Sequence, residues 1–96
     1  MPLVCKRTKK AKQDLAHVAE TIAKDNPQAS IDTVIRVVRL TEEQLSSHPK
    51  LGRAGRNLGT RKLVIASTPY IIVYRLADNL VTISKVFHSA QQWPKL

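Results

Sequence analysis

Positively charged side chains gather in one glycine-containing stretch of the chain. Residues 48–65, HPKLGRAGRNLGTRKLVI, contain five lysines and arginines, no acid and three glycines. Guanidinium groups suit phosphates and carboxylates alike, so the stretch predicts a surface that binds an anionic partner. We expect Arg61 and Arg75 to lie close together on neighbouring antiparallel strands, with the flexible loop folding other cations toward them. The candidate binding residues are Arg53, Arg56, Arg61, Lys62 and Arg75.

Histidine is the main candidate for acid-base chemistry. His88 follows the last apolar stretch and titrates near neutrality, although a single histidine also fits a purely structural role. Carboxylates are scarce in this half, since Asp78 is the only acid after Glu43 and lies in the turn ADN. His17 and His48 are interpreted as structural. No Cys/His spacing typical of a metal site is present, so no metal or cofactor is expected.

The net charge of +9 is unevenly distributed. Residues 1–43 contain eight Lys/Arg against six Asp/Glu, whereas residues 44–96 contain eight against one. A field of one sign opposes compaction, and an anionic partner relieves it, which favours nucleic acid or an acidic protein as partner. A solvated surface that serves only solubility is the alternative interpretation.

The hydrophobic pattern predicts two helices followed by a three-stranded meander. Apolar residues recur at three and four positions from Thr8 to Asp25, and again from Pro27 to about Ser47. Ile31, Val34, Ile35, Val38 and Leu45 form the expected buried stripe of the second helix. Strands are expected at RKLVIA, YIIVYRL and LVTISKVF, with another at the N-terminal PLVCKR. The fold class is therefore α+β, in the order β-α-α-β-β-β, with a helical hairpin on one face of a small antiparallel or mixed sheet.

Length and composition bound the class of protein. Residues 1–96 suffice for one domain with one modest core. The start MPLVCKRTKK lacks the apolar region of a signal peptide, and no apolar run is long enough to span a bilayer, so we expect a cytoplasmic protein without a membrane partner. The single cysteine, Cys5, is interpreted as an inert strand residue rather than a nucleophile.

Four motifs stand out along the chain: HPKLGR after the second helix, GTRKLVI, PYIIVYR and the terminal VFHSAQQWP. Together they resemble the toxins of the RelE/ParE superfamily from bacterial toxin-antitoxin modules, and DNPQAS between the helices is similar to the ParE side. The resemblance covers nearly the whole chain. It implies a growth-inhibiting toxin of a type II, plasmid-stabilising module, neutralised by a cognate antitoxin. The pair would repress its own operon, so that operator DNA is contacted through the antitoxin.

The superfamily contains two modes of action. ParE-type members are associated with poisoning of DNA gyrase without catalysis, and RelE-type members cut mRNA on the ribosome. If the chain were a nuclease, the resemblance implies Arg61, Arg75 and His88 as its catalytic set. However, Gln91 stands where an arginine is frequent, and no tyrosine lies beside His88. The resemblance therefore favours ParE-like action, with ribosome-dependent mRNA cleavage as the alternative and a basic nucleic-acid-binding module as a lesser one. The expected groove for antitoxin and target comprises Arg53, Arg56, Arg61, Lys62, Arg75, His88, Gln91 and Trp93.

Overall fold

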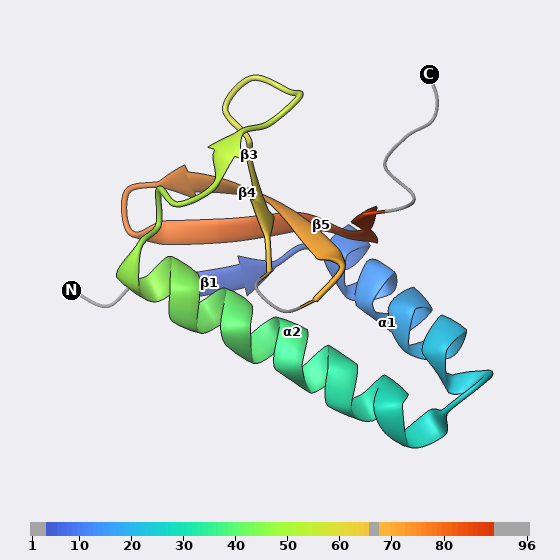
Figure 1. Ribbon diagram of the computed structural model, residues 1–96. Helices are drawn as coiled ribbons and strands as arrows, with labels where there is room; N and C mark the ends of the chain where they lie inside the picture. Colours follow the sequence, from blue (N-terminus) through green and yellow to red (C-terminus); the bar gives the residue numbers. More distant parts are fainter. Residues whose placement is uncertain (1–3, 66–67, 90–96) are drawn as a thin grey trace.

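Two helices and five strands make up the part of the chain that the computed structural model describes, residues 4–65 and 68–89 (Figure 1). A first strand leads into a pair of adjacent helices, and the remaining strands follow. The elements are β1 (Val4–Arg7), α1 (Lys9–Ala23), α2 (Pro27–Ser47), β2 (Arg53–Ala54), β3 (Arg61–Val64), β4 (Tyr70–Ala77) and β5 (Leu80–His88). The predicted α+β class and element order are confirmed, with β2 as an additional short strand.

The sheet is mixed, with strand order β1-β5-β4-β3-β2. β1 pairs with β5 in parallel, whereas β2, β3, β4 and β5 pair antiparallel with their neighbours. The parallel pairing requires a long connection, which the helical hairpin supplies. A β-bulge interrupts the β4–β5 ladder, because Val73 pairs with Lys85 and Tyr74 pairs with Ile83, leaving Ser84 as the extra residue.

Both helices begin at the residues that the sequence predicts. The Thr8 side chain caps α1 by accepting a hydrogen bond from the backbone N–H of Ala11 at 3.1 Å. Asn26 does the same for α2 by accepting from Ala29 N–H at 3.1 Å, and Pro27 occupies the first helical position, where its missing N–H costs nothing. The two helices are therefore separated by only a few residues and pack against each other.

The buried stripe of α2 differs from the prediction. Ile31 and Ile35 are each 56 % exposed, while Ser30, Val37, Thr41 and Leu45 are buried. The apolar residues of α2 extend around more than one face, so periodicity alone does not decide which face is covered. The covered face carries two small hydroxyl residues, and the Thr41 hydroxyl donates to the Val37 carbonyl at 2.6 Å, which removes most of the cost of its burial.

The core lies between the helical hairpin and one face of the sheet. Ile72 and Tyr74 of β4 are almost completely buried there with Leu45 of α2, and Tyr70 joins Val18 and Val37 in a second cluster. Because side chains alternate along a strand, Val73 and Arg75 lie on the opposite face of β4. In the described part of the chain, neither helix is long and apolar enough to cross a bilayer.

Candidate anion-binding groove

A groove with a volume of about 750 Å³ lies between α1, the loop joining β2 to β3, and the sheet. α1 packs along β5 and forms one wall, and residues 55–60 of the loop form the other. The floor is the sheet face that carries Val73. Five basic side chains line this groove: Lys10, Arg56, Lys62, Arg75 and Lys85.

Strand register places the sheet cations on one face. Lys62 of β3 and Lys85 of β5 are the cross-strand partners of Val73, one on each side of it. Directly paired residues point to the same face, so both lysines project from the floor of the groove. Arg75 lies two residues beyond Val73 on β4 and therefore shares this face. The three cations can contact one anionic segment laid across the strands.

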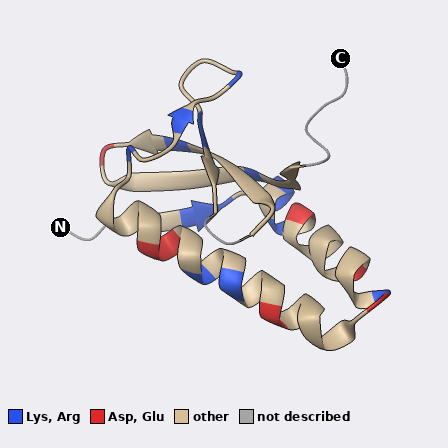
Figure 2. Ribbon diagram, in the orientation of Figure 1, with Lys and Arg blue, Asp and Glu red and all other residues tan. Residues whose placement is uncertain are grey.

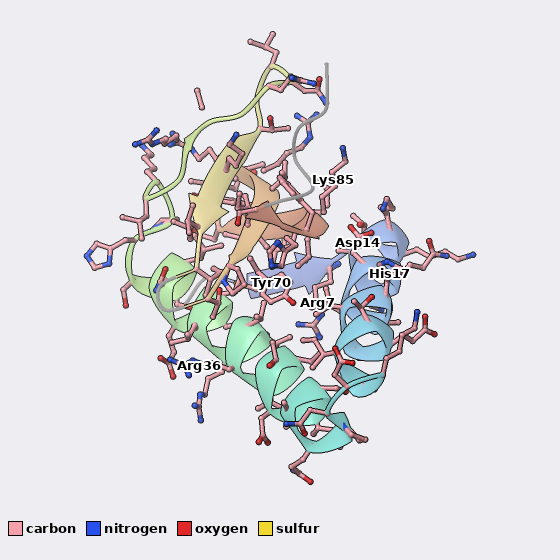
Figure 3. The ribbon with its side chains drawn as sticks, turned by 45° about the vertical axis from the view of Figure 1, so that its right-hand side comes forward. Arg7, Asp14, His17, Arg36, Tyr70 and Lys85 are labelled. Carbon is pink, nitrogen blue, oxygen red and sulfur yellow. The ribbon has the colours of Figure 1, made fainter. Side chains whose placement is uncertain are left out.

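Asp14 is the only acid among the described residues that line the groove, and its carboxylate is already bound. One oxygen accepts from Lys10 Nζ, and the other accepts from the backbone N–H of Val86 at 3.0 Å. The latter bond attaches α1 to β5 beyond the end of β1. Asp14, His17 and Lys85 lie at the same end of the molecule (Figure 3). The carboxylate thus holds the α1 wall in place and leaves the cations of the sheet floor to a ligand.

The loop wall has its own hydrogen bonds. Gly55 N–H donates to the Thr60 carbonyl at 2.8 Å, and both the N–H and the hydroxyl of Thr60 donate to the Asn57 carbonyl, at 3.1 and 2.5 Å. Gly59 has a φ of +82°, which side chains of L-residues rarely adopt. Arg75 Nη1 lies 3.4 Å from the Leu58 carbonyl, so the loop reaches over the arginine. The wall is a defined hairpin turn.

Arg61 does not belong to this groove. It pairs with Tyr74, and so its side chain lies on the helix side of the sheet, where Nη1 donates to the carbonyls of Gly52 at 2.9 Å and Lys50 at 3.2 Å. The predicted proximity to Arg75 holds only for the backbone. Because Arg75 is the next residue after Tyr74, its side chain projects from the other face, and the expectation that the two arginines form one cluster is wrong.

His88 also lies on the helix side of the sheet. It pairs with Tyr70, and the two rings make an edge-to-face contact with centroids 5.4 Å apart. Arg61 and His88 pair with β4 at Tyr74 and Tyr70, four residues apart, which corresponds to about 13 Å along the strand. The structure therefore does not assemble Arg61, Arg75 and His88 into one catalytic set.

The other predicted groove residues have mixed positions. Arg56 and Lys62 line the groove, and Arg53 is exposed on the edge strand β2, paired with Lys62. Gln91 and Trp93 lie outside the described residues.

Sequence reasoning missed three residues of the groove. Lys10 and His17 lie in a regular helical pattern that gives no sign of a binding site. Lys85 follows the β-bulge, which shifts the alternation of side chains between the two faces of β5 by one residue. The sequence does contain a sign of the bulge. Ile83 and Val86 are apolar residues three positions apart in the predicted strand, which breaks the regular two-residue alternation, and the structure shows both of them buried.

Burial raises the pKa of two groups outside the groove. Desolvation raises the pKa of the half-buried Cys5 thiol, the Glu42 carboxylate raises it further, and Arg7 opposes the change. A raised thiol pKa agrees with the prediction of an inert strand residue. Desolvation also raises the pKa of Tyr70. No cluster of three or more His, Cys, Asp or Glu within residues 4–65 and 68–89 could hold a metal ion.

Comparison with known proteins relates the sequence of this chain to bacterial toxins. Residues 6–93 match the family model described as ParE toxin of type II toxin-antitoxin system, parDE. The chain is 39 % identical over 89 residues to Y4kP of Sinorhizobium fredii strain NGR234, named as a candidate toxin, with 93 % of this chain and 91 % of Y4kP covered.

Solved structures from toxin-antitoxin systems share the fold. A chain of the chromosomal ParDE system from P. aeruginosa aligns with a TM-score of 0.78 at 20 % identity, covering 90 % of this chain and 95 % of that one. A chain of the RelBE2 toxin-antitoxin complex from Mycobacterium tuberculosis aligns with a TM-score of 0.67 at 27 % identity, covering 92 % and 99 %. The similarity thus includes structures from both the ParDE and the RelBE systems.

Proposed function

The chain belongs to the ParE toxin family of type II toxin-antitoxin systems, and we propose that it arrests growth by acting on DNA gyrase and is neutralised by a cognate antitoxin. The observation that supports a non-cleaving toxin is the separation of Arg61 and His88 from the groove. A nuclease that used Arg61, Arg75 and His88 would need all three within reach of one phosphate, and the strand register places them on two faces.

The groove is the proposed site of the antitoxin. Its cations Lys62, Arg75 and Lys85 suit carboxylates as well as phosphates, and an extended acidic segment could contact all three across the strands. The P. aeruginosa and M. tuberculosis structures come from systems named for both a toxin and an antitoxin. An antitoxin segment in this groove would cover the surface that the target needs, and any contact with operator DNA would come through the antitoxin.

The test measures gyrase inhibition and mRNA cleavage side by side. Purified protein is added to DNA gyrase in a plasmid supercoiling assay and, separately, to translating ribosomes whose mRNA is mapped for breaks. We expect inhibition or trapping of gyrase and intact mRNA. The double variant Arg75→Gln/Lys85→Gln should lose activity, while Arg36→Gln/Arg39→Gln, which removes two exposed cations from α2, is the matched control.

Ribosome-dependent cleavage is the second candidate, and one observation favours it. His17 of α1 lines the same groove as Lys62, Arg75 and Lys85, so an acid-base group and phosphate-binding cations share one site. If mRNA breaks appear on ribosomes and His17→Gln abolishes them, this candidate replaces the gyrase proposal. Salt-dependent DNA binding without either activity and without growth arrest would instead indicate a nucleic-acid-binding module.

A further inference from the structure

Two side chains on the helix side of the sheet hold the segment that connects α2 to β2. The buried Tyr74 hydroxyl donates to the Pro49 carbonyl at 2.8 Å and accepts from the Gly52 N–H at 2.9 Å. Its cross-strand partner Arg61 donates to the carbonyls of Gly52 and Lys50. Both backbone polar groups of Gly52 are therefore fixed, one by each side chain.

Gly52 fits this arrangement closely. A Cβ atom at this position would lie 2.8 Å from both Cε1 and the hydroxyl of Tyr74, which is shorter than any ordinary contact. Gly52 is buried, and its φ is not in the left-handed region, so the close approach of the tyrosine is the reason that glycine is required here. The segment is thus packed as well as hydrogen-bonded against the sheet.

The held segment leads directly into the loop wall of the groove. Arg53 follows Gly52, β2 pairs with β3 for two residues, and residues 55–60 then turn over the sheet and place Arg56 at the groove. So short a strand fixes the start of the loop weakly by itself. The contacts of Tyr74 and Arg61 immediately before it supply the remaining constraint.

We propose that Tyr74 and Arg61 are positioning residues that set the loop wall of the groove from the opposite face of the sheet, and thereby control how tightly the groove binds an anionic segment. The inference rests on the proposed function only in taking the groove as the binding surface. Arg61 acts here through the two carbonyls that its Nη1 binds on the helix side of the sheet, and its charge does not face the groove.

The experiment compares Tyr74→Phe and Arg61→Lys with Val37→Ala as a control. Tyr74→Phe keeps the buried ring and removes only the hydroxyl. Arg61→Lys keeps the charge, but its side chain is one atom shorter and does not reach the position from which Nη1 binds the two carbonyls. Val37→Ala destabilises the second core cluster, which includes no residue of the segment 48–60. Binding of a fluorescein-labelled oligoglutamate peptide is followed by anisotropy over a salt series, at temperatures where every variant is folded, and hydrogen exchange is measured at the amides of residues 53–60.

We expect both positioning variants to bind the peptide about three- to tenfold more weakly and to exchange faster at Gly55 and Thr60. The salt dependence of Tyr74→Phe should match the parent, because no ion contact is lost, whereas Arg75→Gln should reduce it. Val37→Ala should melt earlier yet keep parental affinity and parental exchange in the loop.

Three results would overturn the inference. The first is parental loop exchange together with parental affinity in Tyr74→Phe. The second is equal loss of affinity in Val37→Ala, which would mean general destabilisation. The third is a reduced salt dependence in a further variant, Arg61→Gln, which removes the charge and would therefore show that Arg61 contacts the ligand.

Failure of the proposed function can be distinguished from failure of the inference. If the parent leaves gyrase unaffected while Tyr74→Phe still loosens the loop and weakens peptide binding, the target is wrong and the positioning role stands. If the parent does not bind the peptide, loop exchange alone decides: faster exchange at Gly55 and Thr60 in Tyr74→Phe supports the positioning role, and parental exchange overturns it.

Discussion

Arg61 and Arg75 are the same residue type on adjacent strands, yet their side chains lie on opposite faces of the sheet and make different contacts. Arg61 is paired with Tyr74 and binds backbone carbonyls on the helix side, while Arg75 lies one residue further along β4 and faces the groove. A step of one residue along a strand exchanges the faces of the sheet. The strand register therefore determines which groups each arginine contacts, although both carry the same charge.

Replacing Arg75 by glutamine should weaken anion binding without unfolding the protein. Arg75 is exposed, and its hydrogen bond to the Leu58 carbonyl is long, so the melting temperature should change little. Loss of a charge-assisted contact costs about 1.5–3 kcal/mol, or roughly ten- to hundredfold in affinity for an acidic antitoxin segment. Titration calorimetry measures this, with Arg39→Gln on α2 as control. Parental affinity in a folded Arg75→Gln protein would exclude Arg75 from the binding surface.

Tyr70 should make stability depend on pH in the alkaline range. Burial raises its pKa above the ordinary value of about 10, because the folded protein disfavours the phenolate. Its contribution is fully present below the unfolded pKa and is lost as pH rises through the higher folded pKa. Urea midpoints measured from pH 8 to pH 11 should therefore fall more steeply for the parent than for Tyr70→Phe. Parallel curves for the two proteins would show that Tyr70 ionises equally easily in both states.

At the level of elements, the main core cluster joins the helical hairpin to the sheet, with Ile72 and Tyr74 from β4 and Val81, Ile83 and Val86 from β5. Ile72 is 1 % exposed and packs with Leu45 of α2, so Ile72→Ala should cost about 2–5 kcal/mol of unfolding free energy. Val64→Ala on β3, where the side chain is 59 % exposed, should stay within about 0.5 kcal/mol of the parent. Urea denaturation measures both. Equal midpoints for Ile72→Ala and the parent would mean that the helices do not cover this face.

Local signals in the sequence were sufficient to predict every described element except the two-residue strand β2. Thr8, Asn26 and Pro27 are helix-start residues whose chemistry is local, so both helix boundaries could be predicted. The meander followed from β-branched runs separated by turns. By contrast, the covered face of α2 depends on tertiary packing, and Ile31 and Ile35 were placed in the core although both are largely exposed.

The candidate site was only partly predictable for the same reason. Arg56, Lys62 and Arg75 could be found as cations near a glycine loop, and all three line the groove. Arg61 and His88 could not be assigned to the helix side, because a side chain's face depends on the register between strands, which composition does not contain. The face on which Lys85 lies could be predicted only if the bulge at Ser84 were known.

On the scale of the whole molecule, the acids are separated from the described strands, whereas cations lie on helices and strands alike. Six of the seven acids lie within residues 14–43, so they belong to α1, α2 and their connection, and Asp78 lies in the β4–β5 turn (Figure 2). Among them only Asp14 lines the groove, where it is bound to Lys10 and Val86. The groove therefore opens on a face with excess positive charge, which would orient an approaching anionic partner before contact.

This separation predicts that an anionic partner associates with the protein faster at low salt. It also predicts that a cation in the groove contributes more to this salt dependence than a cation elsewhere. The Debye length shortens from about 30 Å at 0.01 M salt to about 8 Å at 0.15 M, less than the 24 Å shortest dimension of the molecule, so distant charges should cease to steer the partner. Stopped-flow association with an acidic antitoxin segment should slow by about tenfold or more between these conditions. Lys85→Gln in the groove should reduce that dependence more than Lys24→Gln at the end of α1, although both lower the net charge equally. Equal effects of the two substitutions would mean that net charge alone, rather than the groove, attracts the partner.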